Sequence, residues 1–203
     1  TIVAGRPDGT PDDGRTVSPR ARVGRRTSAF GTSPQVTGRV CQDCRVPSLG
    51  LHCLGIGAGA QRDVIDAVAA AADRCGFATL WAGEHVVMVD ESVSRYPYTG
   101  DGRIAVPADA DWLDPLIALS FAAAATHRIG LATGVLLLPE HNPVITAKQA
   151  ASLDALSGGR LSLGVGIGWS KDEFDALGVP FPRRAERTAE YVAAMRCLWR
   201  DDI

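Results

Sequence analysis

Short apolar segments, each followed by a glycine-rich or polar turn, recur through the middle of this chain. They cover residues 49–55, 78–82, 129–138 and 161–166, and sequence with a helical pattern separates them. A parallel strand covered on both faces reads as such a continuous apolar run, and strands that alternate with helices are typical of βαβ units. The alternation therefore predicts an α/β fold with a parallel sheet, whose ligands bind at the carboxyl ends of the strands.

Residues that start and stop helices mark the segments between these strands. Residues 61–75 carry apolar side chains at helical spacing, and Gly76 follows where a helix C-terminal cap belongs. Asp114 and Pro115 predict a helix start, with Asp as the N-cap and Pro in the first turn. Further helical segments are expected over residues 116–125, 143–156, 173–177 and 184–199.

The strands and helices together make four βα units. A closed (β/α)8 barrel needs eight units and typically about 250 residues. Residues 48–203 are therefore expected to form about the first four βα units of a TIM barrel, a truncated barrel with its strands in sequential order and right-handed crossovers. The chain begins with Thr and stops after Arg200-Asp-Asp-Ile without a terminal element, a pattern that we interpret as that of a fragment.

Residues 1–47 have a composition unlike the rest of the chain. They contain five prolines and many Gly, Ser and Thr, and they show no sustained period of 2 or 3.6 residues. A segment of this kind buries too little apolar surface to offset the entropy lost on ordering. We expect a disordered or non-native N-terminal extension here. Its arginines are dispersed and lack interleaved aromatic residues, so they do not favour a nucleic-acid arm.

The overall composition excludes several classes of protein. The net charge of -2 argues against nucleic acid as a principal partner. No apolar run approaches the ~20 residues needed to cross a bilayer, and the N-terminus lacks the apolar region of a secretory signal. Five cysteines, an odd number, do not suggest a disulfide framework, and Cys41-Gln-Asp-Cys44 has no second pair. We expect a cytoplasmic protein with no metal site.

His85 is the first candidate for chemistry. It lies just past the end of a predicted strand and precedes a loop of about 28 residues, 83–110, which is long enough to be a functional lid. A histidine there can donate or accept a proton at neutral pH, or it can simply bond a neighbouring backbone group. His52 ends the first predicted strand and is a weaker candidate for the same pocket. His127 and His141 read as surface residues.

Several motifs resemble the bacterial luciferase-like superfamily. They are Gly-Phe-x-x-Leu-Trp-x-x-Glu-His at 76–85, Thr-Gly-Val-x-x-Leu-Pro at 133–139, Asn-Pro-x-x-x-Ala-Lys-Gln-x-x-x-Leu-Asp-x-Leu-Ser-Gly-Gly-Arg at 142–160, and Leu-Gly-Val-Gly-x-Gly-Trp at 163–169. The segments 94–98 and 173–181 make the match closer to the branch that uses the deazaflavin coenzyme F420. The resemblance covers residues 49–203 and leaves residues 1–47 outside.

The resemblance implies a TIM barrel that binds a flavin or deazaflavin at the strand ends. His85 matches the family's active-site histidine, which would assist hydride transfer with F420 or oxygen chemistry with FMN. Gly134-Val135 matches a position where these barrels carry a non-proline cis peptide behind the cofactor ring. The resemblance also implies that Gly164, Gly166, Gly168 and Trp169 bind the cofactor, at a strand end kept bare so that the ring can lie against it.

Two residues depart from particular branches of the family. Trp169 stands where F420-dependent sugar-phosphate dehydrogenases place a catalytic acid, and Gly166 stands where light-emitting luciferases have a reactive cysteine. Neither activity is therefore expected. Glu84, Tyr96 and Tyr98 are weaker candidates for contact with substrate.

The leading functional hypothesis is an F420-dependent oxidoreductase that transfers hydride between the deazaflavin and an unidentified small organic substrate. An FMN-dependent luciferase-like monooxygenase is the alternative, and a catalytically weak or inactive fragment is the third. The parent protein is expected to be a homodimer when full length. Neither nucleic acid nor a membrane is expected as a partner.

Overall fold

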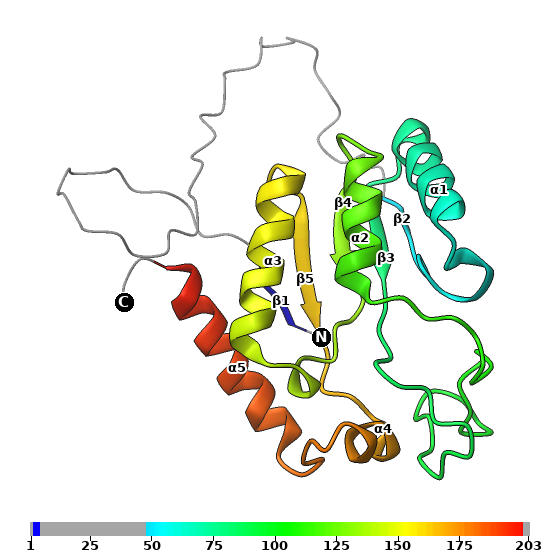
Figure 1. Ribbon diagram of the computed structural model, residues 1–203, viewed down its shortest axis with the longest axis vertical. Coiled ribbons are helices and arrows are strands. Elements are labelled where there is room, and N and C mark those ends of the chain that lie inside the picture. Colours follow the sequence, from blue (N-terminus) through cyan, green and yellow to red (C-terminus); the bar gives the residue numbers. More distant parts are fainter. Residues whose placement is uncertain (1, 5–47, 201–203) are drawn as a thin grey trace, which may run out of the picture.

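Four parallel strands form the centre of the computed structural model, which describes residues 2–4 and 48–200 (Figure 1). They are β2 (Gly50–Leu51), β3 (Thr79–Ala82), β4 (Gly130–Thr133) and β5 (Leu161–Val165), and they pair in the order β5-β4-β3-β2. In the register, Leu80 lies opposite both Leu51 and Leu131. The predicted α/β fold, with parallel strands in sequential order, is confirmed.

A fifth strand comes from the N-terminus. β1 (Ile2–Ala4) pairs antiparallel with β5, so that Val3 lies opposite Gly164. The sequence predicts a disordered or non-native extension over residues 1–47; within it, residues 2–4 form a strand that pairs with β5. The rest of that segment, including Cys41 and Cys44, lies outside the described residues.

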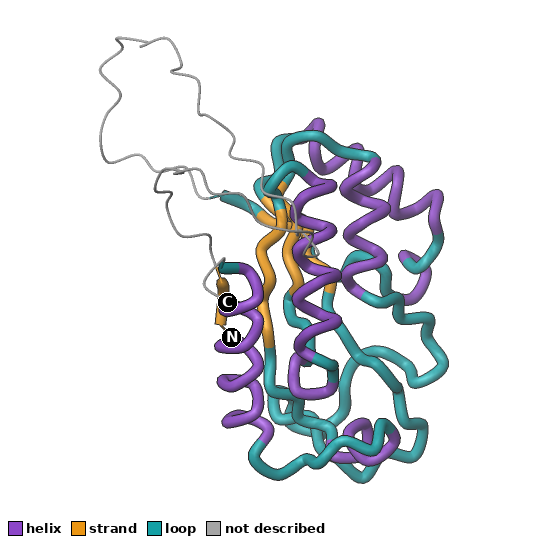
Figure 2. The backbone as a smooth tube through the Cα atoms, turned by 60° about the vertical axis from the view of Figure 1, so that its left-hand side comes forward, coloured by secondary structure: helices purple, strands orange, loops and turns teal. Residues whose placement is uncertain are grey.

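The helices alternate with the strands as the caps predict. The longer ones are α1 (Arg62–Cys75), α2 (Pro115–Ala124), α3 (Pro143–Ser157), α4 (Lys171–Ala176) and α5 (Arg184–Trp199), and two short 3-10 helices are η1 (Gly57–Gly59) and η2 (Leu138–Glu140). The Asp114 side chain accepts the backbone N–H of Ile117, and Gly76 ends α1 in the left-handed conformation. Figure 2 shows the strands as a layer with helices packed beside it. Within the described residues, no helix is both long and apolar enough to span a bilayer.

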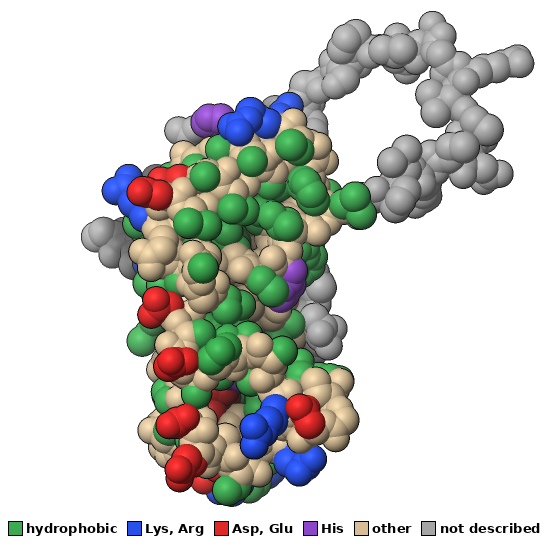
Figure 3. Space-filling view, turned by 90° about the vertical axis from the view of Figure 1, so that its right-hand side faces the viewer, with side chains coloured by type: hydrophobic (Ala, Val, Ile, Leu, Met, Phe, Trp, Pro, Cys, Tyr) green, Lys and Arg blue, Asp and Glu red, His purple; other side chains and the backbone are tan. Residues whose placement is uncertain are grey.

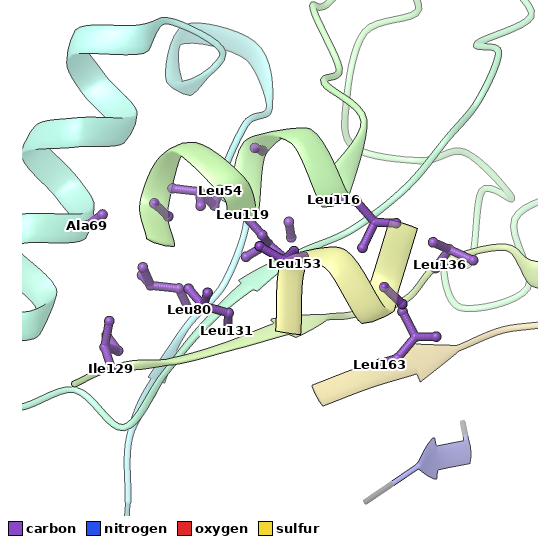
Figure 4. Close-up of a cluster of buried hydrophobic side chains, with 14 of the residues drawn as sticks. Leu54, Ala69, Leu80, Leu116, Leu119, Ile129, Leu131, Leu136, Leu153 and Leu163 are labelled. Atoms are coloured by element: carbon purple, nitrogen blue, oxygen red, sulfur yellow. The ribbon is translucent and has the colours of Figure 1, made fainter. Parts of the chain in front are cut away.

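A core of leucine, isoleucine and alanine side chains joins the sheet to α2 and α3 (Figure 4). Leu80 and Leu131, from adjacent strands, and Leu119 from α2 are completely buried. Burying a side chain of this size contributes about 1.5–3 kcal/mol. This packing fixes the strands, and with them the position of their carboxyl ends.

Two strands are shorter than their apolar segments. β4 ends at Thr133, and a cis peptide follows between Gly134 and Val135, at the place that the family resemblance implies. β2 covers only two residues because the backbone turns soon after it, with Cys53 at φ 69° and Gly55 at φ 82°. A left-handed backbone conformation cannot continue an extended strand. The apolar residues beyond the strands therefore pack as turns at the sheet edge.

Arg160, the arginine of the Gly-Gly-Arg motif, forms hydrogen bonds at the end of the sheet where the strands begin. Its guanidinium donates to the carbonyls of Ser157, Thr126, Ile129 and Ala123 at 2.8–3.1 Å, and to the Thr126 hydroxyl at 2.8 Å. The Ala123 carbonyl belongs to the last turn of α2 and Thr126 follows that helix directly after its C-cap, where a cation is favourable. One side chain thus joins the ends of α2 and α3 to the start of β4.

We expect Arg160→Ala to lower the free energy of unfolding by about 3 kcal/mol, because it leaves several acceptors without a donor. Urea unfolding followed by far-ultraviolet circular dichroism measures the change. The matched control is Arg62→Ala, whose side chain is 75% exposed, pairs with Asp66 at 3.6 Å and lies 5.8 Å from the Phe121 ring centroid. It should cost less than about 1 kcal/mol. Equal losses in the two variants would contradict the anchoring role.

Candidate active site

The segments that follow three neighbouring strands bring titratable side chains to one edge of the sheet. Glu84 and His85 follow β3, Glu140 lies in η2 after β4, and Glu173 lies in α4 after β5. Parallel strands end at the same edge, which is the lower edge of the sheet in Figure 1. Figure 3 shows that the lower part of the molecule is hollowed on this face, with acidic and histidine side chains at the floor of the hollow.

His85 and Glu173 form a contact between two of these segments. The Nδ1 atom of His85 lies 2.9 Å from Glu173 Oε2, and their side chains are 8% and 1% exposed. The other carboxylate oxygen accepts the backbone N–H groups of Val86 at 2.7 Å and Val87 at 3.2 Å. His85 therefore bonds a buried carboxylate rather than a neighbouring backbone group.

Sequence analysis missed Glu173 as a site residue. Ser170-Lys-Asp-Glu173 reads as a helix capping box, in which the glutamate would turn back to its own helix. Ser170 does cap α4 by accepting the Glu173 N–H at 3.3 Å, but the Glu173 side chain reaches across to the loop after β3. Glu173 does lie within the family motif at 173–181, but that motif does not indicate which residue its side chain contacts.

The contact sets the chemistry of the His85 ring. A carboxylate only accepts hydrogen bonds, so Nδ1 carries a hydrogen toward Glu173. Nε2 has no hydrogen-bond partner among residues 2–4 and 48–200. This nitrogen is the one that can exchange a proton with a bound molecule, and the imidazolium formed by protonation is stabilised by the buried carboxylate.

Aromatic side chains lie beside the His85 ring. The His85 ring lies edge-to-face with Trp112 at 4.9 Å between centroids and with Trp169 at 5.8 Å. Trp169 in turn contacts Tyr96 at 5.2 Å, and Tyr96 contacts Tyr98 at 5.3 Å. The structure thus connects four of the predicted site residues, and it adds Trp112, which sequence analysis did not single out.

The loop between β3 and α2 is fastened to α4. The Asp172 carboxylate accepts the Ser92 hydroxyl at 2.7 Å and the Ser94 N–H at 2.9 Å. The hydrogen bond from Ser92, followed by that from the Ser94 backbone, lowers the pKa of Asp172 to about 2. Asp172 and Glu173 therefore hold two parts of the same loop against the first turn of α4.

The Glu84 carboxylate forms hydrogen bonds within the protein. One oxygen accepts the Leu137 N–H at 2.5 Å, and both lie 2.9–3.0 Å from His141 Nε2. His141 was expected at the surface, but its side chain is only 22% exposed because Glu84 holds it against the sheet edge. Burial lowers the pKa of His141, and the hydrogen bond and charge of Glu84 outweigh that effect, so the net shift is upward from 6.5. His127, in contrast, is exposed as expected.

Glu140 is the third carboxyl group at this edge of the sheet. Both of its oxygens are buried without a hydrogen bond in the part of the chain that the structure describes. Burial, together with the nearby charges of Glu173 and Glu84, raises the pKa of Glu140 to about 8. Glu140 is therefore a neutral carboxylic acid at neutral pH.

The glycines predicted to face a cofactor lie where a side chain would clash with other parts of this chain. A Cβ on Gly164 would lie 2.3 Å from the Thr133 carbonyl oxygen, and one on Gly166 would lie 2.5 Å from Val135. Gly168 has φ 72°, and its Cβ would meet the ring of Phe174 at 2.6 Å. Internal packing accounts for these glycines, and their contact with a cofactor stays a prediction.

The cis peptide lies beside the ends of β2 and β3. His52 Nε2 lies 2.9 Å from the Gly134 carbonyl oxygen, and a Cβ on Gly134 would lie 3.0 Å from Trp81. Val135 lies against Gly166 across the next strand end. The predicted cofactor residues Gly134, Val135 and Gly166 are thus neighbours. Among the described residues, no group of three or more His, Cys, Asp or Glu side chains has the arrangement of a metal site.

Comparison with known proteins decides the family. The family model described as luciferase-like monooxygenase matches residues 52–203. The chain belongs to this family. The protein Rv0953c of Mycobacterium tuberculosis is 44% identical over 133 residues, which are 66% of this chain and 47% of that protein. The chain therefore spans about half the length of the curated relatives that it matches.

Solved structures show the same fold. Monooxygenase RslO1 from Streptomyces bottropensis shares 27% identity with a TM-score of 0.60, over 77% of this chain and 44% of that one. An FMN complex of 3,6-diketocamphane monooxygenase from Pseudomonas putida (21% identity, TM-score 0.56, 75% and 39% covered) and an F420-dependent secondary alcohol dehydrogenase (22%, 0.55, 76% and 42%) share the fold alone. The solved structures with this fold thus include both an FMN complex and an F420-dependent enzyme.

Glu140 predicts a pH dependence of stability. Its folded-state pKa of about 8 lies above the unfolded value of 4.5, so the unfolded state loses the proton first as the pH rises. Its contribution to stability is complete below about pH 4.5 and falls by at most ~1.4 kcal/mol per pH unit until about pH 8.

Glu140→Gln should remove this loss, because the amide stays neutral. The measurement is urea unfolding at several pH values from 5 to 8, with the exposed Glu91→Gln as the control. We expect the variant to gain stability over the wild type progressively across this range. A difference that does not change with pH would contradict the burial of an unpaired carboxyl.

Proposed function

We propose that this chain carries the histidine centre of an F420-dependent oxidoreductase that transfers hydride between the deazaflavin and an organic substrate. The observation that carries the proposal is the His85–Glu173 pair, buried at the strand ends with Nε2 free of protein partners in residues 2–4 and 48–200. Motifs at 94–98 and 173–181 favour the F420 branch.

The residues at the strand ends fit a flat cofactor ring with the imidazole of His85 beside it. The His85 ring lies edge-to-face with the indole rings of Trp112 and Trp169, and its side chain is 8% exposed. The deazaflavin supplies the two-electron chemistry when it is bound. The protein supplies orientation and the movement of the accompanying proton.

His85 performs the proton step. Oxidation of an alcohol releases a hydride from carbon and a proton from oxygen, and Nε2 accepts that proton while Glu173 stabilises the imidazolium. In the reverse direction Nε2 returns the proton to the carbonyl oxygen. Glu173 keeps the ring in one orientation through its second set of bonds, to Val86 and Val87.

An FMN-dependent monooxygenase is the second candidate. RslO1, which shares 27% identity with this chain, is described as a monooxygenase. The same His85 Nε2 would then serve proton transfers in oxygen chemistry rather than in alcohol oxidation. The two candidates differ in the cofactor, so the cofactor is what the experiment must separate.

The direct test is titration with F420 and, separately, with FMN. Quenching of tryptophan fluorescence reports the binding of each cofactor. We expect F420 to bind at least about tenfold more tightly than FMN, a difference of about 1.4 kcal/mol. FMN binding that equals or exceeds F420 binding overturns the F420 proposal in favour of the second candidate. Binding of neither contradicts both.

The role of His85 is tested with His85→Asn and Glu173→Gln. With isopropanol as the probe, both should slow reduction of bound F420 by about 100-fold or more while the F420 dissociation constant changes little. Lys148→Gln, an exposed change on α3, is the matched control. A His85→Asn variant with an unchanged rate removes His85 from the mechanism.

A further inference from the structure

The tip of the loop between β3 and α2 is hydrogen-bonded within itself. The Tyr96 N–H donates to the Gly102 carbonyl at 2.8 Å, and Arg95 Nη2 donates to the Asp101 carbonyl at 3.0 Å. Gly102 has φ 72°, and a Cβ there would lie 2.8 Å from Arg95 Nε, so the glycine lets the arginine pack across the turn. Residues 92–103, here called the loop tip, are therefore braced internally and can move as one unit.

The base of the same loop is held separately from its tip. Trp112 Nε1 donates to the Gly83 carbonyl at 3.0 Å, which joins the two ends of the loop. The Glu173 carboxylate accepts the two backbone N–H groups that directly follow His85. A movement of the loop tip can therefore leave the base, and with it the contact between His85 and Glu173, in place.

Asp172 is the residue of α4 that holds the loop tip. Its Oδ2 atom accepts both the Ser92 hydroxyl at 2.7 Å and the Ser94 N–H at 2.9 Å. In return, the Asp172 N–H donates to the Ser94 hydroxyl at 3.2 Å. Within residues 2–4 and 48–200, the hydrogen bonds from the loop tip to other elements all go to Asp172. Its carboxylate lies in the first turn of α4, where a negative charge is favourable.

The loop tip places Tyr96 against the aromatic side chains beside His85. The centroid of the Tyr96 ring lies 5.2 Å from that of Trp169, which lies 5.8 Å from that of His85. Figures 1 and 2 both show the loop beside α4, below the sheet. The His85 side chain is 8% exposed in this arrangement. Displacement of the tip would separate Tyr96 from Trp169 and uncover this side of His85.

We propose that the loop tip is a lid over His85 and that Asp172 is its latch. With the latch formed, Tyr96 covers the aromatic side chains beside His85. With the latch broken, the tip moves away on the segments 88–91 and 104–110, which form no hydrogen bond to other elements among the described residues, and a ligand reaches His85. Asp172 is thus a positioning residue that acts through Tyr96. The lid goes beyond the proposed function, since it works alike with either cofactor.

The lid is tested without a cofactor, by the reaction of the histidines with diethyl pyrocarbonate, which acylates an accessible neutral imidazole. Trypsin places each of the four histidines on a different peptide, so mass spectrometry measures each rate separately. Asp172→Ala should raise the rate at His85 by about tenfold or more, because it removes hydrogen bonds to a charged group. The rate at the exposed His127 should stay unchanged.

A graded series separates the latch from a general effect on α4. Asp172→Asn keeps an oxygen that accepts the Ser94 N–H, so its rate at His85 should lie between those of the wild type and Asp172→Ala. Ser92→Ala removes one hydrogen bond of the latch and should raise the rate by at least about twofold. The matched control is Asp175→Ala, an exposed change on the same helix, which should leave the rate unchanged.

The ¹⁵N shift of His85 Nδ1 distinguishes an open lid from a damaged site. It should stay at its wild-type value in each variant, because the contact with Glu173 is not part of the latch; a rate increase that comes with a changed shift overturns the lid.

An unchanged rate at His85 in both Asp172→Ala and Ser92→Ala overturns the proposal, and so does an increase that His127 shares. If Asp172→Ala does not fold, Ser92→Ala decides alone. Because no F420 or FMN is present, failure here is distinct from failure of the proposed function.

Discussion

The hydrogen bond between His85 and Glu173 joins the end of β3 to the first turn of α4, and the arrangement of the site depends on it. The two residues are 88 positions apart in the sequence. The same carboxylate binds the backbone of Val86 and Val87, so one buried charge fixes both the ring and the start of the long loop. Hydrogen bonds to a buried carboxylate are roughly twice as strong as those between neutral groups.

Glu84, Glu140 and Glu173 form an acidic cluster around this contact, and their carboxyl groups have different surroundings. Glu84 and Glu173 are stabilised by donors, and each has a histidine as one of them. Glu140 has no donor in the described part of the chain and is kept neutral by burial and by the two neighbouring charges. A buried unpaired acid costs stability, and such costs are common where a site must move protons.

Much of the fold follows from local sequence signals. The N-cap at Asp114, the C-cap at Gly76 and the apolar strand segments predict the elements and their order, because these signals act through neighbouring residues. The position of His85 past a strand follows in the same way. The strand lengths do not, since β2 and β4 end where the backbone turns rather than where the apolar run stops.

Local sequence signals do not show which residues of the site contact each other. Glu173 satisfies a helix-capping pattern, and His141 follows the short helix η2, so neither shows from sequence that it bonds a residue more than 50 positions away. The strand β1 is also unpredictable, because three residues among prolines carry no period. Family motifs indicate which residues matter, but only packing shows what each one contacts.

The tautomer of His85 tests the central contact most directly. In ¹⁵N spectra of the wild-type chain at a pH where the ring is neutral, the structure predicts a protonated Nδ1 and an unprotonated Nε2, in a single tautomer. A proton on Nε2, or an averaged signal from both tautomers as in free histidine, would contradict the claim that Glu173 orients His85 for proton transfer.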